Sequence, residues 1–135
     1  MKEVTARWVS DQKFMATDSA GHSIVMDGEG FSPSELLLAA LAGCTGIDVI
    51  SILKKQRQQV TGLEIKATGS QLPDPPWTYQ EIHVEYTVRG HHLKESAVTR
   101  AIELSETKYC SVGSTISGRA KIITSYRIVE EEVAL

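Results

Sequence analysis

The sequence is poor in cysteine, with only Cys44 and Cys110 among 135 residues. They lie too far apart for a C-x-x-C redox motif, and two cysteines cannot complete a zinc knuckle. The four histidines form no H-E-x-x-H or comparable spacing, so the sequence predicts neither a metal nor a cofactor. The opening residues also lack the basic-then-apolar pattern of an export signal. We therefore expect free thiols in a reducing, cytoplasmic setting.

An excess of positive charge is also missing. The formal net charge is −3, and no stretch is dense in Lys and Arg. This argues against nucleic acid or an anionic membrane as a main partner. We find no internal repeat, low-complexity tract or linker, and a chain of this length can bury one core. We expect a single domain over residues 1–135.

What the sequence does contain is a long apolar run over Leu36–Leu53 with Cys44 near its centre. The run is nearly long enough to span a membrane. However, Asp48 lies inside it and small residues dominate its middle, so insertion into a bilayer would be costly. We expect a buried helix in a soluble protein.

The start of this helix has a clear signal. Ser32-Pro33-Ser34-Glu35 is a capping box, with Ser32 at the N-cap, proline at the first helical position and Glu35 three residues after the cap. The helix is expected to run to about Gln59, and its residues 54–57 are polar or charged.

Around this helix, short stretches alternate apolar and polar residues as strands do. The expected strands cover residues 4–10, 13–19, 22–27, 63–72, 79–88 and 120–130. A second amphipathic helix is expected over about Lys94–Lys108. The fold class is therefore α+β.

Dimerisation follows from the apolar helix. A helix that is apolar on all faces needs cover on all faces, and one five- or six-stranded sheet with one further helix can hardly supply it. Packing Leu36–Leu53 against its own copy would, and two-fold dimers are the commonest oligomers. We expect a homodimer.

Asp48 is a site candidate because it is charged within an apolar helix. It lies four residues after Cys44 on the same helix face, where its ionised form would raise the pKa of the thiol. A buried aspartate needs a partner, such as an N–H group or the hydroxyl of Ser51. Contact between Cys44 and Cys110 is allowed but not required by the sequence, since both could be small buried hydrophobes.

Two motifs resemble the OsmC/Ohr family: S-P-S-E-L-L-L-A-A-L-A-G-C over residues 32–44 and K-Y-C-S-V over residues 108–112. The order of the elements also matches, over nearly the whole chain. The resemblance implies an OsmC-like fold, with antiparallel sheets packed around a long buried central helix in an intertwined homodimer. Ser111 stands where many members have proline, which places the chain nearer a divergent OsmC-like branch.

Many members of that family are thiol-dependent organic hydroperoxide reductases. The resemblance implies that Cys44 is the catalytic thiol that attacks the peroxide, and that Cys110 resolves the resulting sulfenic acid to a disulfide. An external dithiol would then reduce the disulfide. Apolar surroundings of Cys44 would favour organic hydroperoxides over hydrogen peroxide.

The sequence departs from the well-studied members in two places. They use an arginine from the N-terminal loops, which residues 22–30 lack, and a glutamate ten residues before the first cysteine, where Ser34 stands here. Glu35 lies nine residues before Cys44, on the opposite side of the helix and about 13–14 Å away along its axis. Its simpler role is capping, and Glu35 and Asp48 are auxiliary catalytic candidates.

Three functions remain open on the sequence, in this order. The first is the organic hydroperoxide reductase. The second is a non-catalytic dimer that binds a small molecule, with Cys44 lining an apolar pocket, as loss of the arginine and glutamate would predict. The third is another thiol chemistry, such as acyl transfer. A Cys44 that reacts only above the free-thiol pKa of about 8.5 would speak against the first.

Overall fold

The structure is a computed structural model that describes residues 1–132. It contains two compact units, one formed by residues 1–37 and the other beginning at Leu38. The first unit holds a three-stranded antiparallel sheet of β1 (Val4–Ser10), β2 (Lys13–Asp18) and β3 (Ser23–Met26), in the order β1-β2-β3. These bounds agree with the expected strands to within one or two residues.

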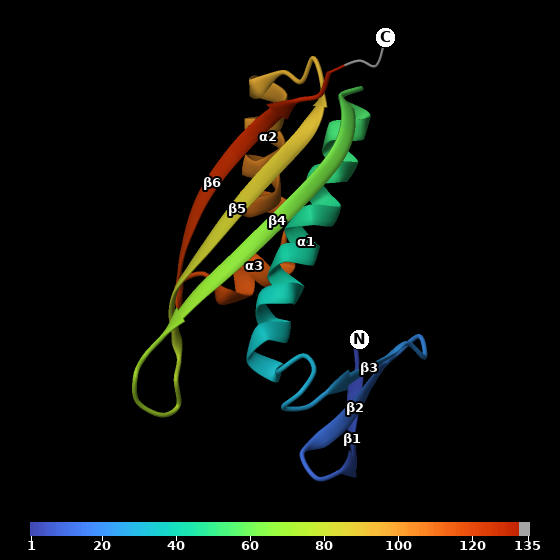
Figure 1. The fold of residues 1–135 in the computed structure, drawn as a ribbon, viewed down its shortest axis with the longest axis vertical. Helices are drawn as coiled ribbons and strands as arrows, with labels where there is room; N and C mark the ends of the chain where they lie inside the picture. The colour runs from blue at the N-terminus through green and yellow to red at the C-terminus, as the bar shows by residue number, and fades with distance from the viewer. Residues whose placement is uncertain (133–135) are drawn as a thin grey trace. The chain divides into compact units, whose positions relative to one another are not determined.

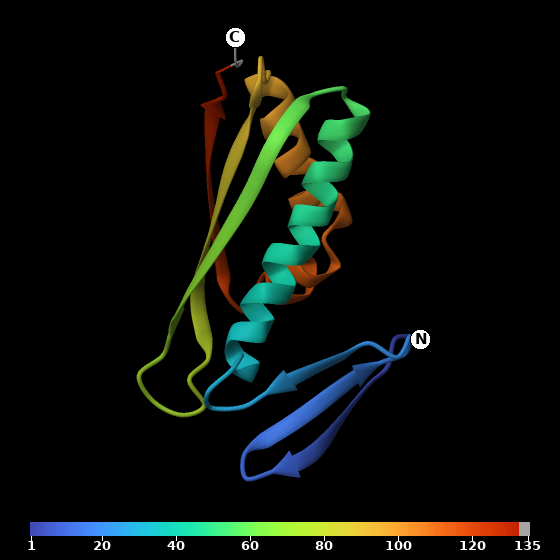
Figure 2. The ribbon, with the colours of Figure 1, turned by 45° about the vertical axis from the view of Figure 1, so that its right-hand side comes forward.

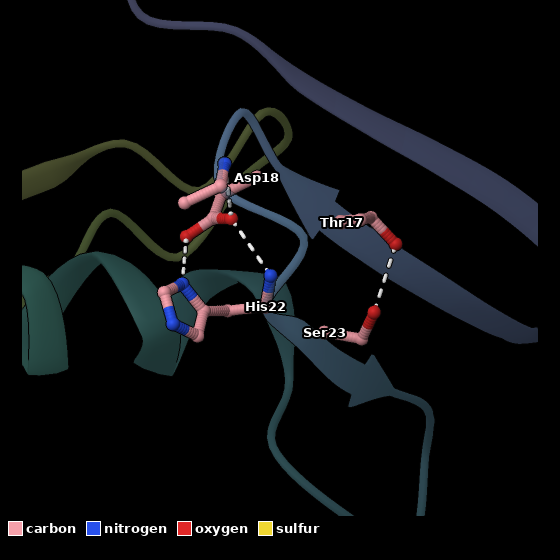
Figure 3. A network of polar contacts seen from close by, with 5 residues as sticks. Thr17, Asp18, His22 and Ser23 are labelled. Carbon is pink, nitrogen blue, oxygen red and sulfur yellow. Dashed lines mark hydrogen bonds and ion pairs between the residues drawn. The ribbon is translucent and has the colours of Figure 1, made fainter.

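The turn between β2 and β3 is held by one carboxylate. Asp18 accepts hydrogen bonds from the backbone N–H groups of Ala20 and His22, at 2.9 and 2.8 Å, and its other oxygen lies 3.0 Å from the His22 ring (Figure 3). The hydroxyls of Thr17 and Ser23 pair across the strands at 2.9 Å. These contacts pin the register of the hairpin.

Most of the large apolar side chains of this small sheet are exposed. Trp8 is 66% exposed and Phe31 57% exposed, and Ile24 and Val25 are exposed as well. Ala16 is the one buried apolar side chain among residues 1–37. Exposed apolar surface of this kind is typical of a site where other protein surface binds.

The long helix α1 (Pro33–Lys55) begins in the first unit and continues through the second. The remaining elements are β4 (Gln59–Gln71), β5 (Tyr79–His91), α2 (Glu95–Leu104), the π-helical turn η1 (Ser105–Tyr109), α3 (Ser111–Ile116) and β6 (Lys121–Glu130). The second sheet has the order β4-β5-β6, and α1, α2 and α3 lie on the same face of it (Figures 1 and 2).

The topology of this sheet differs from the expectation of antiparallel strands in one pairing. β4 and β5 are antiparallel as expected, but β6 runs parallel to β5. The reason is the connection: the chain leaves β5, passes through α2, η1 and α3, and returns to enter β6 from the same end, as a crossover does. The strands therefore form two sheets of three rather than one of five or six.

The end of α1 lies four residues before the expected one. Arg57 adopts a left-handed conformation with φ of 59°, its N–H bonds to the Lys54 carbonyl at 3.0 Å, and the Gln58 N–H bonds to the Leu53 carbonyl at 3.0 Å. This is a Schellman closure, usually made by glycine. The sequence predicted a longer helix because Arg57 occupies the position at which glycine usually marks the end of a helix.

The core lies between the second sheet and one side of α1. Buried apolar side chains come from α1, β5 and α2, and include Leu41, Val49, Leu53, Ile82, Val84, Tyr86, Val88, Val98 and Ala101. The other side of α1 is apolar but open, with Ile47 69% exposed. Among residues 1–132, α1 is the one helix long and apolar enough to cross a membrane by length and composition.

Candidate functional site

The two cysteines meet in space. Cys44, in the middle of α1, and Cys110, at the start of α3, are both free thiols. Their Sγ atoms and a carboxylate oxygen of Asp48 all lie within 4.8 Å of one another. Cys44 is half-buried and Cys110 is 4% exposed. The contact that the sequence left open is present.

The π-helical turn η1 explains how Cys110 reaches this place. The Cys110 N–H bonds to the Ser105 carbonyl at 2.8 Å, five residues back. In an ordinary α-helix two residues five apart would point about 140° away from each other. The wider π turn brings them closer to one side, so that Ser105 and Cys110 both contact residues of α1.

Cys110 also caps the short helix that follows it. Its Sγ accepts a hydrogen bond from the Gly113 N–H at 3.3 Å. A side chain at Gly113 would crowd this contact, because an added Cβ would lie 3.3 Å from the Cys110 Sγ. The start of α3 therefore supplies an N–H donor to the Cys110 sulfur.

The surroundings of Cys44 favour its thiolate on balance. Burial is the largest single influence and opposes ionisation, but hydrogen bonds from the Cys110 thiol, the Val112 N–H and the Ser111 hydroxyl outweigh it and lower the pKa of Cys44. The nearby Asp48 charge works against this. No cation is among these causes, so the groups that favour the thiolate are hydrogen-bond donors from Cys110 and from the start of α3.

Cys110 shows the opposite behaviour. Burial, followed by its hydrogen bond to Cys44, raises the pKa of Cys110 to about 11, and the Gly113 N–H only partly offsets this. In this pair the charge sits on Cys44 and the proton stays on Cys110. One sulfur is suited to attack an electrophile, and the other is a protonated neighbour within reach of the product.

Asp48 finds its partner on a different element from the one expected. Its Oδ2 accepts a hydrogen bond from the Ser105 hydroxyl at 2.9 Å, whereas Ser51 is exposed. Ser105 Oγ lies 2.7 Å from Thr45 Oγ1, which lies 2.8 Å from the Tyr86 hydroxyl. Sequence reasoning missed Ser105, Thr45 and Tyr86, because a lone hydroxyl residue on a helix or strand carries no motif.

A small cavity lies next to this cluster. Its volume is about 190 Å³, and it is lined by Leu41, Thr45, Val84, Tyr86, Glu106, Cys110, Gly113, Ser117, Ile122 and Thr124. Cys110, and not Cys44, is among the lining residues. The volume is below the roughly 300–1,000 Å³ of typical ligand pockets.

Glu35 has a structural role in the first unit. The Glu35 N–H bonds to Ser32 Oγ at 3.2 Å, as the capping box predicts. The Glu35 carboxylate accepts a hydrogen bond from the Ser32 hydroxyl at 3.4 Å. Arg7, Arg100 and Arg119 are all exposed.

The same three donor atoms could hold a metal ion. Cys44, Asp48 and Cys110 are the one such group found among residues 1–132. Sequence spacing could not disclose it, since Cys110 lies 66 positions after Cys44. Two thiolates and a carboxylate are a donor set that suits zinc.

Comparison with known proteins agrees with this architecture. A family model described as OsmC-like protein matches residues 26–125. Protein YhfA of Escherichia coli K12 is 38% identical over 131 residues, which cover 94% of this chain and 98% of YhfA. The crystal structure of a hypothetical protein from Aquifex aeolicus is 34% identical, covers 98% of both chains and has a TM-score of 0.91. The organic hydroperoxide resistance protein OhrB of Bacillus subtilis shares the fold at 20% identity, with a TM-score of 0.61 and 94% and 98% coverage.

Proposed function

The chain belongs to the family of OsmC-like proteins, and from that premise we propose that it is a thiol-dependent organic hydroperoxide reductase. The observation that carries the proposal is the pair of contacting sulfurs with opposite pKa shifts, Cys44 lowered and Cys110 raised. The hydroperoxide resistance named for the Bacillus subtilis protein of the same fold supports the choice of substrate class.

In the proposed cycle the Cys44 thiolate attacks the terminal oxygen of the hydroperoxide. An S–O bond forms, the O–O bond breaks, and the alkoxide leaves with one added proton as the alcohol. The Cys110 sulfur then attacks the Cys44 sulfenic acid, the S–O bond breaks, and water leaves. The resulting disulfide accepts two electrons and two protons from an external dithiol, which restores both thiols.

The contact between the sulfurs gives this cycle a physical advantage. A sulfenic acid with no thiol beside it is open to a second peroxide, which oxidises it irreversibly to sulfinic acid. Cys110 remains protonated and adjacent until the sulfenic acid forms. Capture within the protein then requires no encounter with another molecule.

We also propose that the protein acts as a homodimer through the open side of α1. OsmC-like proteins are typically dimeric. The open side forms a shallow apolar groove lined by Ala42, Gly43, Gly46, Ile47, Ile50, Leu63 and Ile65. Two glycines on this side let a second helix approach closely, and the exposed apolar surface of the β1–β3 sheet would also gain cover in an intertwined dimer.

The setting is proposed to be the cytoplasm. The family is one of soluble proteins, and α1 fits the role of its core helix. Both thiols are free, as a reducing compartment requires.

The test is peroxide consumption with a dithiol reductant. Cumene hydroperoxide and hydrogen peroxide are supplied separately to wild type, Cys44→Ser and Cys110→Ser, with Ser51→Ala, at an exposed position near the end of α1, as the control. We expect turnover that prefers cumene hydroperoxide, is lost in Cys44→Ser and is unchanged in Ser51→Ala. In Cys110→Ser we expect one rapid oxidation of Cys44 followed by inactivation through sulfinic acid.

A second function is favoured by the small cavity beside Cys110. If wild type consumes no peroxide above the dithiol background, the chain is better described as a non-catalytic dimer that binds a small molecule there. The cavity volume of about 190 Å³ suits a ligand about the size of benzene.

A further inference from the structure

Three side chains that can bind a soft metal ion converge at the sulfur pair. Cys44 and Asp48 lie four residues apart on α1 and share one face of the helix. The H-E-x-x-H motif uses the same spacing to place two ligands of one zinc ion on a helix face. Cys110 comes from the junction of η1 and α3, so the third donor approaches from a different element.

The separations of the donor atoms are close to those that a bound zinc ion requires. In a tetrahedral site with Zn–S bonds of about 2.3 Å and Zn–O bonds of about 2.0–2.2 Å, neighbouring ligand atoms lie about 3.6–3.8 Å apart. The two Sγ atoms and a carboxylate oxygen of Asp48 all lie within 4.8 Å of one another. Side-chain movements of about 1 Å therefore bring all three donors to one ion.

Two of the donors are held in place by hydrogen bonds behind them. The Ser105 hydroxyl donates to Asp48 Oδ2 at 2.9 Å, and Ser105 Oγ lies 2.7 Å from Thr45 Oγ1. The Cys110 Sγ accepts the Gly113 N–H at 3.3 Å. A carboxylate has about four lone-pair sites, so Asp48 keeps capacity for an ion. Partners of this kind orient metal ligands and commonly change metal affinity by about 10–100-fold.

Charge and access also favour a cation here. Asp48 takes part in none of the ion pairs found among residues 1–132. Two thiolates and a carboxylate are three negative charges, and a divalent ion would offset two of them. Cys44 and Asp48 are half-buried, so an ion can enter from solvent and water can complete its coordination.

The types of donor indicate which ion fits. Magnesium and calcium take oxygen ligands, so a pair of sulfurs disfavours both. Copper(I) is selected by thiolates and thioethers, and a carboxylate suits it poorly. Zinc binds cysteine sulfur and aspartate oxygen alike, and three protein ligands plus one water is its usual open coordination.

We propose that Cys44, Asp48 and Cys110 form a zinc site in the reduced protein, with water as the fourth ligand. On binding, each sulfur donates a lone pair to the ion, any thiol proton passes to solvent, and no electron is transferred. The lone pair with which Cys44 would attack an electrophile is then engaged, so bound zinc holds this thiol unreactive. A disulfide removes both sulfur ligands, so zinc and the disulfide exclude each other. The site needs only the reduced thiols and does not depend on the proposed reductase function.

Zinc and cobalt(II) are the probes. Reduced protein, freed of reductant and kept anaerobic, is titrated with zinc chloride in a calorimeter. A separate titration uses cobalt(II), whose sulfur-to-metal charge-transfer absorption reports bound thiolates. The same titrations are made on Cys44→Ser, Cys110→Ser and Asp48→Asn, and on wild type oxidised with diamide, which forms the disulfide without a peroxide. Glu103→Gln is the control, because Glu103 is an exposed carboxylate of α2 outside the group.

We expect one zinc ion per chain and a cobalt charge-transfer band in reduced wild type, with both retained in Glu103→Gln. Each cysteine variant should bind zinc at least about 100-fold more weakly, and oxidised wild type should lose the site. Asp48→Asn should bind about tenfold or more weakly while keeping the band, because both thiolates remain. Saturating zinc should slow alkylation of Cys44 by iodoacetamide about tenfold or more in wild type.

Three results would overturn the site. The first is the absence of zinc binding by reduced wild type at micromolar concentration. The second is binding of equal strength in the oxidised protein or in the cysteine variants, because the ion would then lie elsewhere on the chain. The third is an unchanged affinity in Asp48→Asn, which would reject the carboxylate as a ligand. The reductase is tested separately on zinc-free protein: a chain that binds zinc as expected but consumes no peroxide keeps the site and loses the reductase.

Discussion

The two sides of α1 reverse the usual distribution of polar and apolar groups. The side facing the second sheet buries Thr45 and half-buries Cys44 and Asp48 among apolar neighbours. On the opposite side Ile47 is exposed, and Gly43 and Gly46 line the apolar groove. Burying a polar group costs free energy unless the group is hydrogen-bonded. An exposed apolar group contributes none of the free energy that its burial would provide.

Each reversal has a different explanation. Among residues 1–132, every fully buried side-chain nitrogen or oxygen atom has a hydrogen-bond partner. On the buried side of α1 the cost of burying polar groups is therefore offset by a connected network. On the open side no such compensation is available within one protomer. The first pattern is typical of a site that performs chemistry and the second of a surface that binds a partner, and the same helix supplies both.

The largest effect is expected from charging the open side. Ile47→Glu would place two carboxylates, related by the two-fold axis, inside the proposed dimer interface, and should raise the dimer dissociation constant at least ~1,000-fold. Sedimentation velocity would detect monomer at micromolar concentration. Ile47→Val keeps the apolar contact and should remain dimeric. An Ile47→Glu protein that stays dimeric would place the interface elsewhere.

The next effect compares truncations on the two sides. Leu53, which is fully buried, should lose about 2–5 kcal/mol of unfolding free energy on change to Ala. Ile47→Ala should cost less than ~0.5 kcal/mol in the monomer. Urea unfolding in an Ile50→Glu background, in which a charge at another position of the same groove keeps the protein monomeric, measures both. Equal losses would show that Ile47 is buried by the protomer itself.

Asp48→Asn should make the Cys44 thiol more reactive. Loss of the Asp48 charge lowers the pKa of Cys44, so iodoacetamide should react faster at neutral pH. Cumene hydroperoxide reduction should also become faster, because more of Cys44 is then thiolate. Stopped-flow rates with each reagent check this. Unchanged rates with both reagents would show that the Asp48 charge has no influence on the thiol.

The smallest effect concerns the hydrogen bond between the sulfurs. In wild type the rate of alkylation against pH should show Cys44 titrating below the ordinary thiol range and Cys110 at about 11. Cys110→Ala removes a donor to the Cys44 thiolate, so the pKa of Cys44 should rise and its reactivity at neutral pH should fall. Cys110→Ser retains a hydroxyl donor and should shift less. An unchanged profile in Cys110→Ala would assign the effect to the donors of α3 alone.

Elements with strong local signals were predictable from the sequence. β1 and β6 have nearly the expected bounds because their alternation is regular and their ends are marked by turns. The start of α1 was predictable because the capping box satisfies its first N–H groups. α3 was missed, since its residues Ser111–Ile116 include glycine and hydroxyl residues of weak helix propensity and form few turns.

The candidate site was predictable in its charged and sulfur-bearing members only. Cys44 and Asp48 stand out because their polarity conflicts with the helix around them. The contact with Cys110 and the partner of Asp48 depend on the crossover from β5 to β6 and on the π turn, which are set by tertiary packing. Thr45 and Tyr86 acquire a role only from what they touch across the core.

The π turn has a consequence for how this protein can vary during evolution. Three residues, Glu106, Thr107 and Lys108, lie between Ser105 and the pair Tyr109-Cys110, and all three are exposed. Their identities can drift wherever the exposed side chain has no role of its own. Their number cannot, because one insertion or deletion would rotate Cys110 away from Cys44 while Ser105 stayed on Asp48. A descendant with one residue more or fewer here would keep the contact between Ser105 and Asp48 and lose the contact between its two sulfurs.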